Sequence, residues 1–223
     1  MENRDDTKSS MELVNVPPLV STYRQALRTF DVKLKSDLDT NFSKLKSMMD
    51  KLRAEDFGFD AHLSHPDTWS ATQKAPCTYI EVISGAVRIR SFTEYPLKEV
   101  VNLIDFATRA KHEAARLAKG LHQKRRLFAE VSSHRTCREN AETCVLTPTI
   151  SNYHEIEALE MPAAFFDILS PPYDTLIEDV GPRRCRYYNV VNEISCNLVE
   201  LQEIDVPTCF YCDTSPYLGP KLA

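Results

Sequence analysis

The sequence is poor in glycine and has no long apolar run. Only 5 of its 223 residues are glycine and its 13 prolines form no repeat, which excludes a collagen-like or glycine-rich low-complexity chain. No uninterrupted apolar stretch approaches the roughly 18 residues that a membrane-spanning helix needs. Apolar residues still make up 43% of the chain and aromatic residues 9%, which is enough to bury a substantial core in one domain.

Targeting signals and a disulfide framework are also missing. The first residues, from Met1 to Asp6, are acidic and have neither the apolar core of a signal peptide nor the arginine-rich bias of a transit peptide. The 7 cysteines are an odd number without the spacing of a secreted domain, so we expect reduced thiols. These absences predict a cytoplasmic protein without a membrane partner.

The net charge of −5 conceals an uneven distribution. Residues 109–126 contain seven Lys/Arg and one acid, whereas residues 127–223 contain six Lys/Arg and fifteen acids. A solvated helix face explains the basic stretch most simply, and a site for RNA or another anion is the alternative. Because the isoelectric point is near 5.7 and no aromatic residues interleave the basic ones, we do not expect a nucleic-acid partner.

The front of the chain has a helical pattern. Apolar residues recur every three or four positions from Leu19 to Leu52, which predicts one amphipathic helix, or two that a cap at Asp39–Asn41 separates. Residues 58–76 contain prolines and many polar side chains and are interpreted as a linker. A second helical region is predicted from Pro96 to about Phe128.

Strand patterns dominate the remainder. Thr78–Phe92 is rich in β-branched residues and predicts two short strands joined near Ser84 and Gly85. Further short strands are predicted at Cys144–Leu146, Ala163–Leu169, Cys185–Val191 and Cys196–Leu201. The back half of the chain is therefore expected to be mainly β and antiparallel.

Three side chains in or just before predicted strands could carry chemistry. On an extended strand, Cys185 and Tyr187 are two positions apart and project from the same face, so a thiol and a phenol can be neighbours. His154 precedes a predicted strand, where a histidine serves either as a hydrogen-bonded structural residue or as a metal ligand. Local sequence leaves both alternatives open for His154, and a packing role explains the Cys185 and Tyr187 pair more simply than a chemical one.

Six segments, in this order, resemble the thiol dioxygenases typified by cysteamine dioxygenase, a family to which the plant cysteine oxidases are related. The segments are Phe42–Asp56, Cys144–Pro148, Asn152–Ile156, Pro162–Asp174, Cys185–Tyr188, and the tail Phe210–Cys212 with Pro216–Lys221. They cover about half of the chain, and the segments beginning at Pro162 and Cys185 are the most specific.

The resemblance implies a mainly β fold, a cupin-type antiparallel β-barrel that follows an N-terminal helical region. It divides the chain into helical residues 1–57, a linker at 58–76 and a cupin-like domain at 77–223 with a helical insertion at about 96–128. The family holds Fe(II) on three histidines, and it adds both atoms of O₂ to a thiolate to give a sulfinic acid. Its substrates are cysteamine and peptides with an N-terminal cysteine, and we expect a monomer.

The resemblance also assigns roles to individual residues. His154 matches the third iron ligand. Cys185 and Tyr187 match a pair that can form a thioether cross-link beside the metal, which places them in the catalytic site. Asp167 and Tyr173 match polar residues of the substrate pocket, where a carboxylate could bind the substrate ammonium.

One family segment has no counterpart in this chain. The first two iron ligands of the family come from a His-x-His-Pro segment between the strands that match Cys77–Val82 and Ile83–Arg90, but here Val82 runs directly into Ile83. Because the missing piece is about 35 residues, several strands of ordinary length, we expect an incomplete barrel. His62 and His65 resemble the motif only superficially, since their spacing is one residue too long and they precede the strand.

The missing segment leaves two further interpretations open. The chain could be a catalytically inactive partial cupin that binds partners through the helices at 19–52 and 96–128. It could also be a truncated isoform, from a skipped exon or a faulty gene model.

Overall fold

The computed structural model describes residues 16–31, 37–58, 72–74, 77–96, 110, 124–178, 181–208 and 216–222. Its helices are α1 (Pro18–Thr29), α2 (Leu38–Met49) and the short 3₁₀ helix η2 (Ala54–Phe57). Its strands are β1 (Thr72–Lys74), β2 (Cys77–Tyr95), β3 (Arg126–Arg138), β4 (Cys144–Leu146), β5 (Tyr153–Ser170), β6 (Leu176–Ile177), β7 (Gly181–Pro182), β8 (Tyr187–Ser195) and β9 (Leu198–Ile204). Among these elements, no helix has the length and apolar character needed to cross a membrane.

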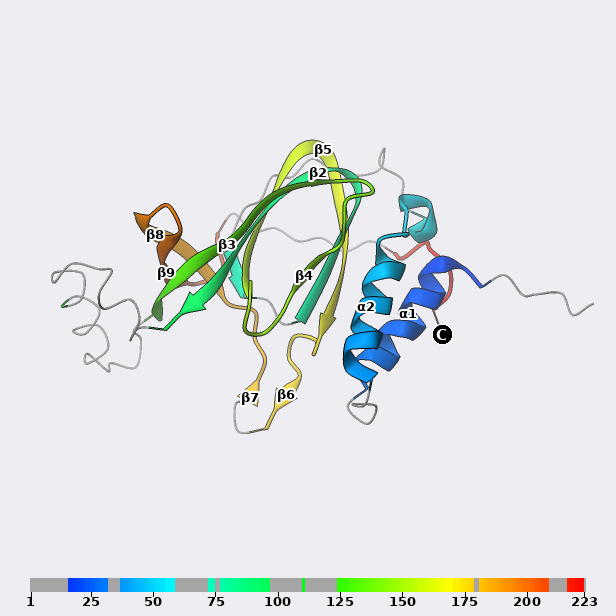
Figure 1. Ribbon diagram of the computed structural model, residues 1–223, viewed down its shortest axis with the longest axis horizontal. Coiled ribbons are helices and arrows are strands. Elements are labelled where there is room, and N and C mark those ends of the chain that lie inside the picture. Colours follow the sequence, from blue (N-terminus) through cyan, green and yellow to red (C-terminus); the bar gives the residue numbers. More distant parts are fainter. Residues whose placement is uncertain are drawn as a thin grey trace, which may run out of the picture.

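The two N-terminal helices lie side by side against one end of the sheet (Figure 1). Pro18 begins α1, a position where its missing N–H costs nothing. On α2, Leu45 and Met49 are four residues apart and fully buried, and they pack with Tyr79 of β2. Of the two alternatives left open by the sequence, one helix or two, the structure has two. Helix α2 already begins at Leu38, so the predicted break at Asp39–Asn41 was placed too late.

The seven main strands form one antiparallel sheet in the order β3-β9-β8-β1-β5-β2-β4, and an additional pairing joins β3 to β2. The strand pairings therefore form a ring that begins and ends at β3. In this ring β1 is the weakest member, because it forms only two residue pairs with β5 and two with β8. The result is a strongly curled, incompletely closed barrel. This mainly β, antiparallel architecture confirms the predicted fold class.

Strand β2 is one continuous, bent strand, and the prediction of two short strands joined near Ser84 and Gly85 was wrong. Gly85 lies at the bend with a φ of 69°, in the left-handed region. A Cβ atom at this position would come within 2.5 Å of the carbonyl oxygen of Pro162 on β5. Glycine therefore allows the paired strands β2 and β5 to turn together, with register shifts between Val82 and Val87.

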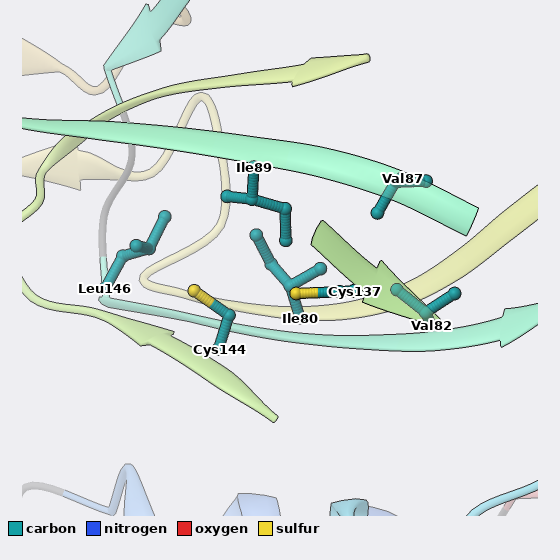
Figure 2. Packing of buried hydrophobic residues seen from close by; sticks show 7 residues of the cluster. All are labelled: Ile80, Val82, Val87, Ile89, Cys137, Cys144 and Leu146. Carbon is teal, nitrogen blue, oxygen red and sulfur yellow. The ribbon is translucent and has the colours of Figure 1, made fainter. Parts of the chain in front are cut away.

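The bend makes the two halves of β2 face each other across an aliphatic core (Figure 2). The side chains of this inner cluster are Ile80, Val82, Val87, Ile89, Cys137, Cys144 and Leu146. A second cluster, on the opposite face of the later half of β2, contains Phe92, Leu127, Ala129, Tyr153, Tyr188, Val199 and Leu201. The sheet is therefore packed on both faces, and the N-terminal helices cover the outer face of the earlier half of β2.

Two predicted boundaries need correction. The helical insertion was expected to reach about Phe128, but Arg126–Phe128 begin β3, where Leu127 and Phe128 are buried and pair with β9. The rest of that insertion, at 97–109 and 111–123, lies outside the described residues. The predicted linker at 58–76 contains β1, whose pairing with β5 and β8 depends on distant parts of the chain.

Candidate functional site

His154 lies on β5 in a row of residues that crosses the sheet. It is directly opposite Ser91 of β2 on one side and opposite Gln73 of β1 on the other. Tyr187 of β8 is also opposite Gln73. Since directly opposed residues share a face, His154 and Tyr187 face the same side with one strand between them, so their backbones are about 10 Å apart by ordinary strand spacing.

The imidazole of His154 is buried and unpartnered. Its side chain is 7% exposed, and its Nδ1 atom makes no hydrogen bond. Burial lowers the pKa of His154 from 6.5 to about 4, so the ring is neutral at physiological pH. A neutral imidazole with a free ring nitrogen is the form that binds a metal ion.

The surroundings of His154 do not complete a metal site. On β2, β3 and β5, the nearest residues on the same face are aliphatic or hydroxylic: Ile156, Ile89 and the hydrogen-bonded pair Ser91 and Ser133. Within the described ranges, no three His, Cys, Asp or Glu side chains surround a common point. The donor set described here therefore does not fit an iron held by three histidines.

His134, the other histidine within the described residues, cannot complete the set. It is opposite Arg90 of β2, one position from Ser91, so it projects from the face opposite to that of His154. There it lines a charged hollow with Arg88, Arg90, Glu155, Glu157 and Glu193. The remaining candidates, His62 and His65, lie outside the described residues.

Cys185 does not lie on a strand, which corrects the geometry expected from the sequence. Strand β8 begins at Tyr187, and Cys185 belongs to the irregular segment before it. The rule that residues two apart share a strand face therefore does not apply to this pair. Tyr187 is 8% exposed, whereas Cys185 is half-buried.

The structure instead brings Cys185 together with Tyr173, another residue singled out from the sequence. Burial raises the pKa of the Tyr173 phenol, and the charge of Cys185 and its side-chain hydrogen bond with Tyr173 raise it further. The guanidinium carbon of Arg183 lies 4.3 Å from the centre of the Tyr173 ring. Arg183 also donates a hydrogen bond to the carbonyl oxygen of Pro171 at 2.7 Å, which ties the two segments together.

Asp167 shares the face of the inner aliphatic cluster. It lies on β5 opposite Ile80, a member of that cluster. Its side chain reaches solvent, yet the protein around the carboxyl removes enough water to raise its pKa. No contact joins Asp167 to the Tyr173 and Cys185 pair among the interactions of the described residues.

Sequence reasoning missed three residues of this region: Ser91, Ser133 and Arg183. The Ser91 hydroxyl is 2.7 Å from that of Ser133, and this pair adjoins His154 across β2. The alternation of Val87, Ile89 and Ser91 contained a signal, because a serine continues an otherwise apolar face. Arg183 left no comparable signal, since its contact with Tyr173 depends on the hairpin of β6 and β7.

Known proteins resemble this chain over most of its length. The family model PCO_ADO matches residues 79–222. The chain is 30% identical to the 2-aminoethanethiol dioxygenase of Homo sapiens over 224 residues, covering 82% of this chain and 81% of the relative. It is 44% identical to the 2-aminoethanethiol dioxygenase of Mus musculus over 95 residues, 38% of this chain and 36% of that relative. The part of this chain that is covered, 82% of its 223 residues, is shorter than the 224 aligned positions. Some residues of the human relative are therefore aligned with gaps in this chain.

Proposed function

The chain belongs to the PCO_ADO family of thiol dioxygenases, and from this premise we propose that it is an iron-dependent thiol dioxygenase whose metal site is incomplete. By family it is an oxidoreductase that acts on a thiol and O₂. The proposed substrates are cysteamine or a peptide with an N-terminal cysteine. In the family reaction both oxygen atoms of O₂ join the thiolate sulfur, which becomes a sulfinate.

The observation that carries this proposal is the isolation of His154 on its face of the sheet. A three-histidine iron site needs two more imidazoles within reach of the same point. Ser91, Ser133 and Ile89 occupy the neighbouring positions on β2 and β3, and none of them is a ligand that iron prefers. The gaps on the side of this chain in its alignment with the human relative support a missing segment.

Iron binding and turnover test the proposal together. The purified chain would be incubated with Fe(II) without oxygen, desalted, and analysed for iron per chain and for sulfinate formed from cysteamine and from a peptide with an N-terminal cysteine. We expect far less than one iron per chain and no sulfinate above the level of His154→Gln, the matched control.

Two outcomes would contradict parts of the proposal. One iron per chain with sulfinate formation, lost in His62→Gln or His65→Gln, would place the missing ligands outside the described residues and overturn the incomplete site. Turnover that His154→Gln leaves unchanged would overturn the assignment of His154 as a ligand. Turnover with cysteamine alone would exclude the peptide substrate.

A second candidate function, a partial cupin that binds a partner, is supported by an apolar hollow between the helices and the sheet. This hollow has a volume of about 530 Å³ and is lined by Phe30, Phe42, Ser43, Lys46, Tyr79, Val145, Thr147 and Pro148. A stable, monodisperse, metal-free chain would favour this function, whereas aggregation of the isolated chain would favour a truncated isoform. If a partner binds in this hollow, Phe42→Asp should abolish that binding without unfolding the sheet.

A further inference from the structure

A buried carboxylate lies beneath the end of helix α2. Glu81 of β2 is opposite Phe166 of β5, which packs against the helices, so Glu81 also faces them. Its side chain is 1% exposed. The Oε2 atom accepts a hydrogen bond from the Thr143 hydroxyl at 2.8 Å, but Oε1 has no partner. A buried carboxylate with one satisfied oxygen is costly in its charged form.

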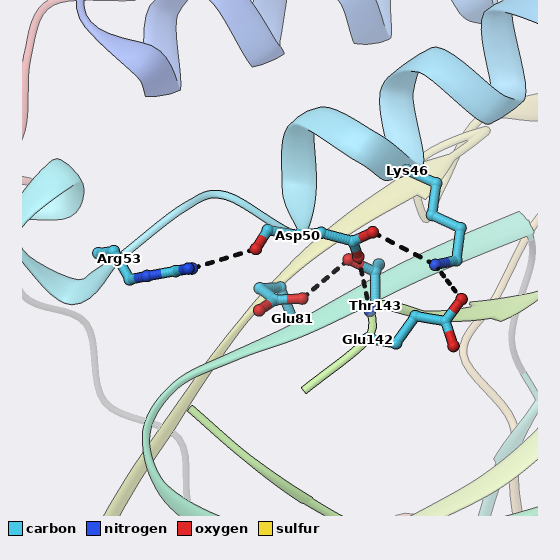
Figure 3. A network of polar contacts seen from close by, with 6 residues as sticks. All are labelled: Lys46, Asp50, Arg53, Glu81, Glu142 and Thr143. Carbon is cyan, nitrogen blue, oxygen red and sulfur yellow. Dashed lines mark hydrogen bonds and ion pairs between the residues drawn. The ribbon is translucent and has the colours of Figure 1, made fainter. Parts of the chain in front are cut away.

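Thr143 connects this carboxylate to a second one on the helix (Figure 3). Asp50 follows the last residue of α2, and its Oδ1 atom accepts a hydrogen bond from the Thr143 backbone N–H at 2.8 Å. The other oxygen of Asp50 accepts from Lys46 at 3.4 Å. One threonine therefore donates to two carboxylates, with its hydroxyl to the sheet residue and its backbone N–H to the helix residue.

The two carboxyl groups are driven toward different charge states. Burial raises the pKa of Glu81, the Thr143 hydroxyl offsets this in part, and the charge of Asp50 raises it again. Burial opposes ionisation of Asp50 too, but the bonds from Thr143 and Lys46 outweigh it and lower its pKa. The arrangement favours a charged Asp50 beside a neutral Glu81.

Other ionisable groups around Glu81 do not neutralise it directly. Arg53, after α2, donates to the backbone carbonyls of Asp50 and Leu52 instead. Lys46 is held by Asp50 and, at 2.6 Å, by Glu142. On β3, burial raises the pKa of Cys137, the charge of Arg135 lowers it, and the charge of Glu81 raises it further. These groups moderate the local charge without pairing with the free oxygen of Glu81.

We propose that Glu81 is a proton-controlled latch for helix α2, in which the neutral carboxyl keeps the end of the helix docked through Thr143 and Asp50. Loss of the proton places two negative charges on either side of Thr143, one of them out of contact with water, and loosens the last turn of α2. The residues released would include Met49, which packs with Leu45 and Tyr79. The latch requires neither metal nor substrate, so it stands independently of the proposed function.

The direction of the pH effect follows from proton linkage. A carboxyl with a raised pKa in the folded state binds a proton that the undocked state releases. Docking is therefore strongest below the ordinary value of 4.5 and is lost as pH rises through the raised pKa of Glu81. Within that window the opening constant of α2 should rise by up to about tenfold for each unit of pH, and it should be constant above it.

Hydrogen exchange of the full metal-free chain tests the latch. Exchange of the α2 amides would be measured from pH 4.5 to 8, corrected for intrinsic rates, with β9 as an internal reference. We expect α2 of the wild type to lose protection as pH rises while β9 stays constant. Glu81→Gln, which keeps the shape and cannot ionise, should remove the pH dependence, and Glu142→Gln, which removes an exposed carboxylate of the same network, should retain it.

The outcomes separate a latch from a general loss of stability. Equal pH dependence in the wild type and Glu81→Gln, or a parallel loss of protection in β9, would overturn the proposal. Thr143→Val provides a second, independent readout because it removes the hydroxyl donor to Glu81 and keeps the backbone N–H to Asp50. In Thr143→Val, the pH range over which α2 loses protection should extend to higher pH. Thr143→Ser, which keeps a hydroxyl donor, should behave as the wild type. An unchanged pH range in Thr143→Val would also overturn the latch.

Discussion

The helix-facing (outer) side of β2 and its inner side differ in how their buried polar side chains are held. On the outer face, Asp50 and Thr143 join helix to sheet through short hydrogen bonds, and the aromatic rings of Tyr79 and Phe42 stack 6.1 Å apart. On the inner face, His154 is a buried imidazole whose Nδ1 has no partner. Glu81 on the outer face also has one oxygen without a partner, but Thr143 binds its other oxygen, whereas no hydrogen bond holds the imidazole nitrogen Nδ1 of His154.

This difference follows from what packs against each face of the sheet. The outer face is built from α1, α2 and strands present in this chain, so its packing is self-sufficient. The inner face contains the aliphatic inner cluster, including Ile89, and next to Ile89 on the same face of β2 lies Ser91, which is opposite His154. The following substitutions test what each face contributes to stability.

Tyr79→Ala should have the largest effect on stability. Its ring is 1% exposed and contacts both Phe30 and Phe42, so its removal leaves a cavity between helices and sheet. We expect a loss of about 3–5 kcal/mol in the free energy of unfolding, measured by urea denaturation. Leu27→Ala on the exposed side of α1 is the control and should change stability by less than about 0.5 kcal/mol.

Ile89→Ala tests whether the inner face is a packed core or a hydrated pocket. The side chain is 1% exposed and belongs to the inner aliphatic cluster near His154. For a packed core we expect a loss of about 2–5 kcal/mol, whereas a hydrated pocket would tolerate the change at a cost of less than about 1 kcal/mol. Ile150→Ala, at a side chain that is 62% exposed, provides the matched control.

The sequence predicted the features that depend on local pattern. The spacing of Leu45 and Met49 identified the buried face of α2. His154 was expected just before a strand, but β5 already begins at Tyr153 and includes it. The sequence did not predict the continuous β2 strand, because the role of Gly85 depends on how closely the β5 backbone approaches. Strand β3 (Arg126–Arg138) was not predicted at all, and its start was assigned to a helix because Arg126 continues a basic stretch that resembles a solvated helix.

The candidate site was predicted less completely than the fold. His154 and Tyr187 share a face only because β1 pairs with both of their strands, and residues 72–74 had been interpreted as linker. The contact between Cys185 and Tyr173 depends on the β6 and β7 hairpin, whose strands have two residues each. Elements of this length leave no periodic signal, so tertiary pairing alone determines them.

Asp50→Ala should have an intermediate effect that depends on pH. It removes the acceptor of the Thr143 backbone N–H and of Lys46, and we expect a loss of about 1–3 kcal/mol at neutral pH. Because the pKa of Asp50 is lowered in the folded state, its contribution is present above the ordinary value of 3.8 and is lost as pH falls through the lowered pKa. Wild type and variant should therefore converge in stability under acid.

The control for this prediction is Asp205→Ala, because Asp205 pairs with Lys124 at the surface and its side chain is 89% exposed. It should alter the free energy of unfolding by less than about 0.5 kcal/mol at any pH where the chain is folded. If Asp50→Ala were as mild as this control, the polar contacts at the end of α2 would contribute nothing to docking, and the contrast between the two faces would be lost.

The smallest effect is expected for the ion pair of Arg88 and Glu157, on the charged face opposite to His154. The charged atoms are 2.6 Å apart, but the side chains are 41% and 47% exposed, so water screens the interaction. A double-mutant cycle with Arg88→Ala and Glu157→Ala should give a coupling energy of about 0.2–1 kcal/mol, and 1 M salt should reduce it. The more exposed pair of Arg138 and Glu160 should give a smaller value. A coupling energy above about 2 kcal/mol that salt does not reduce would mean that this ion pair is buried away from water, which would contradict the exposure of both side chains.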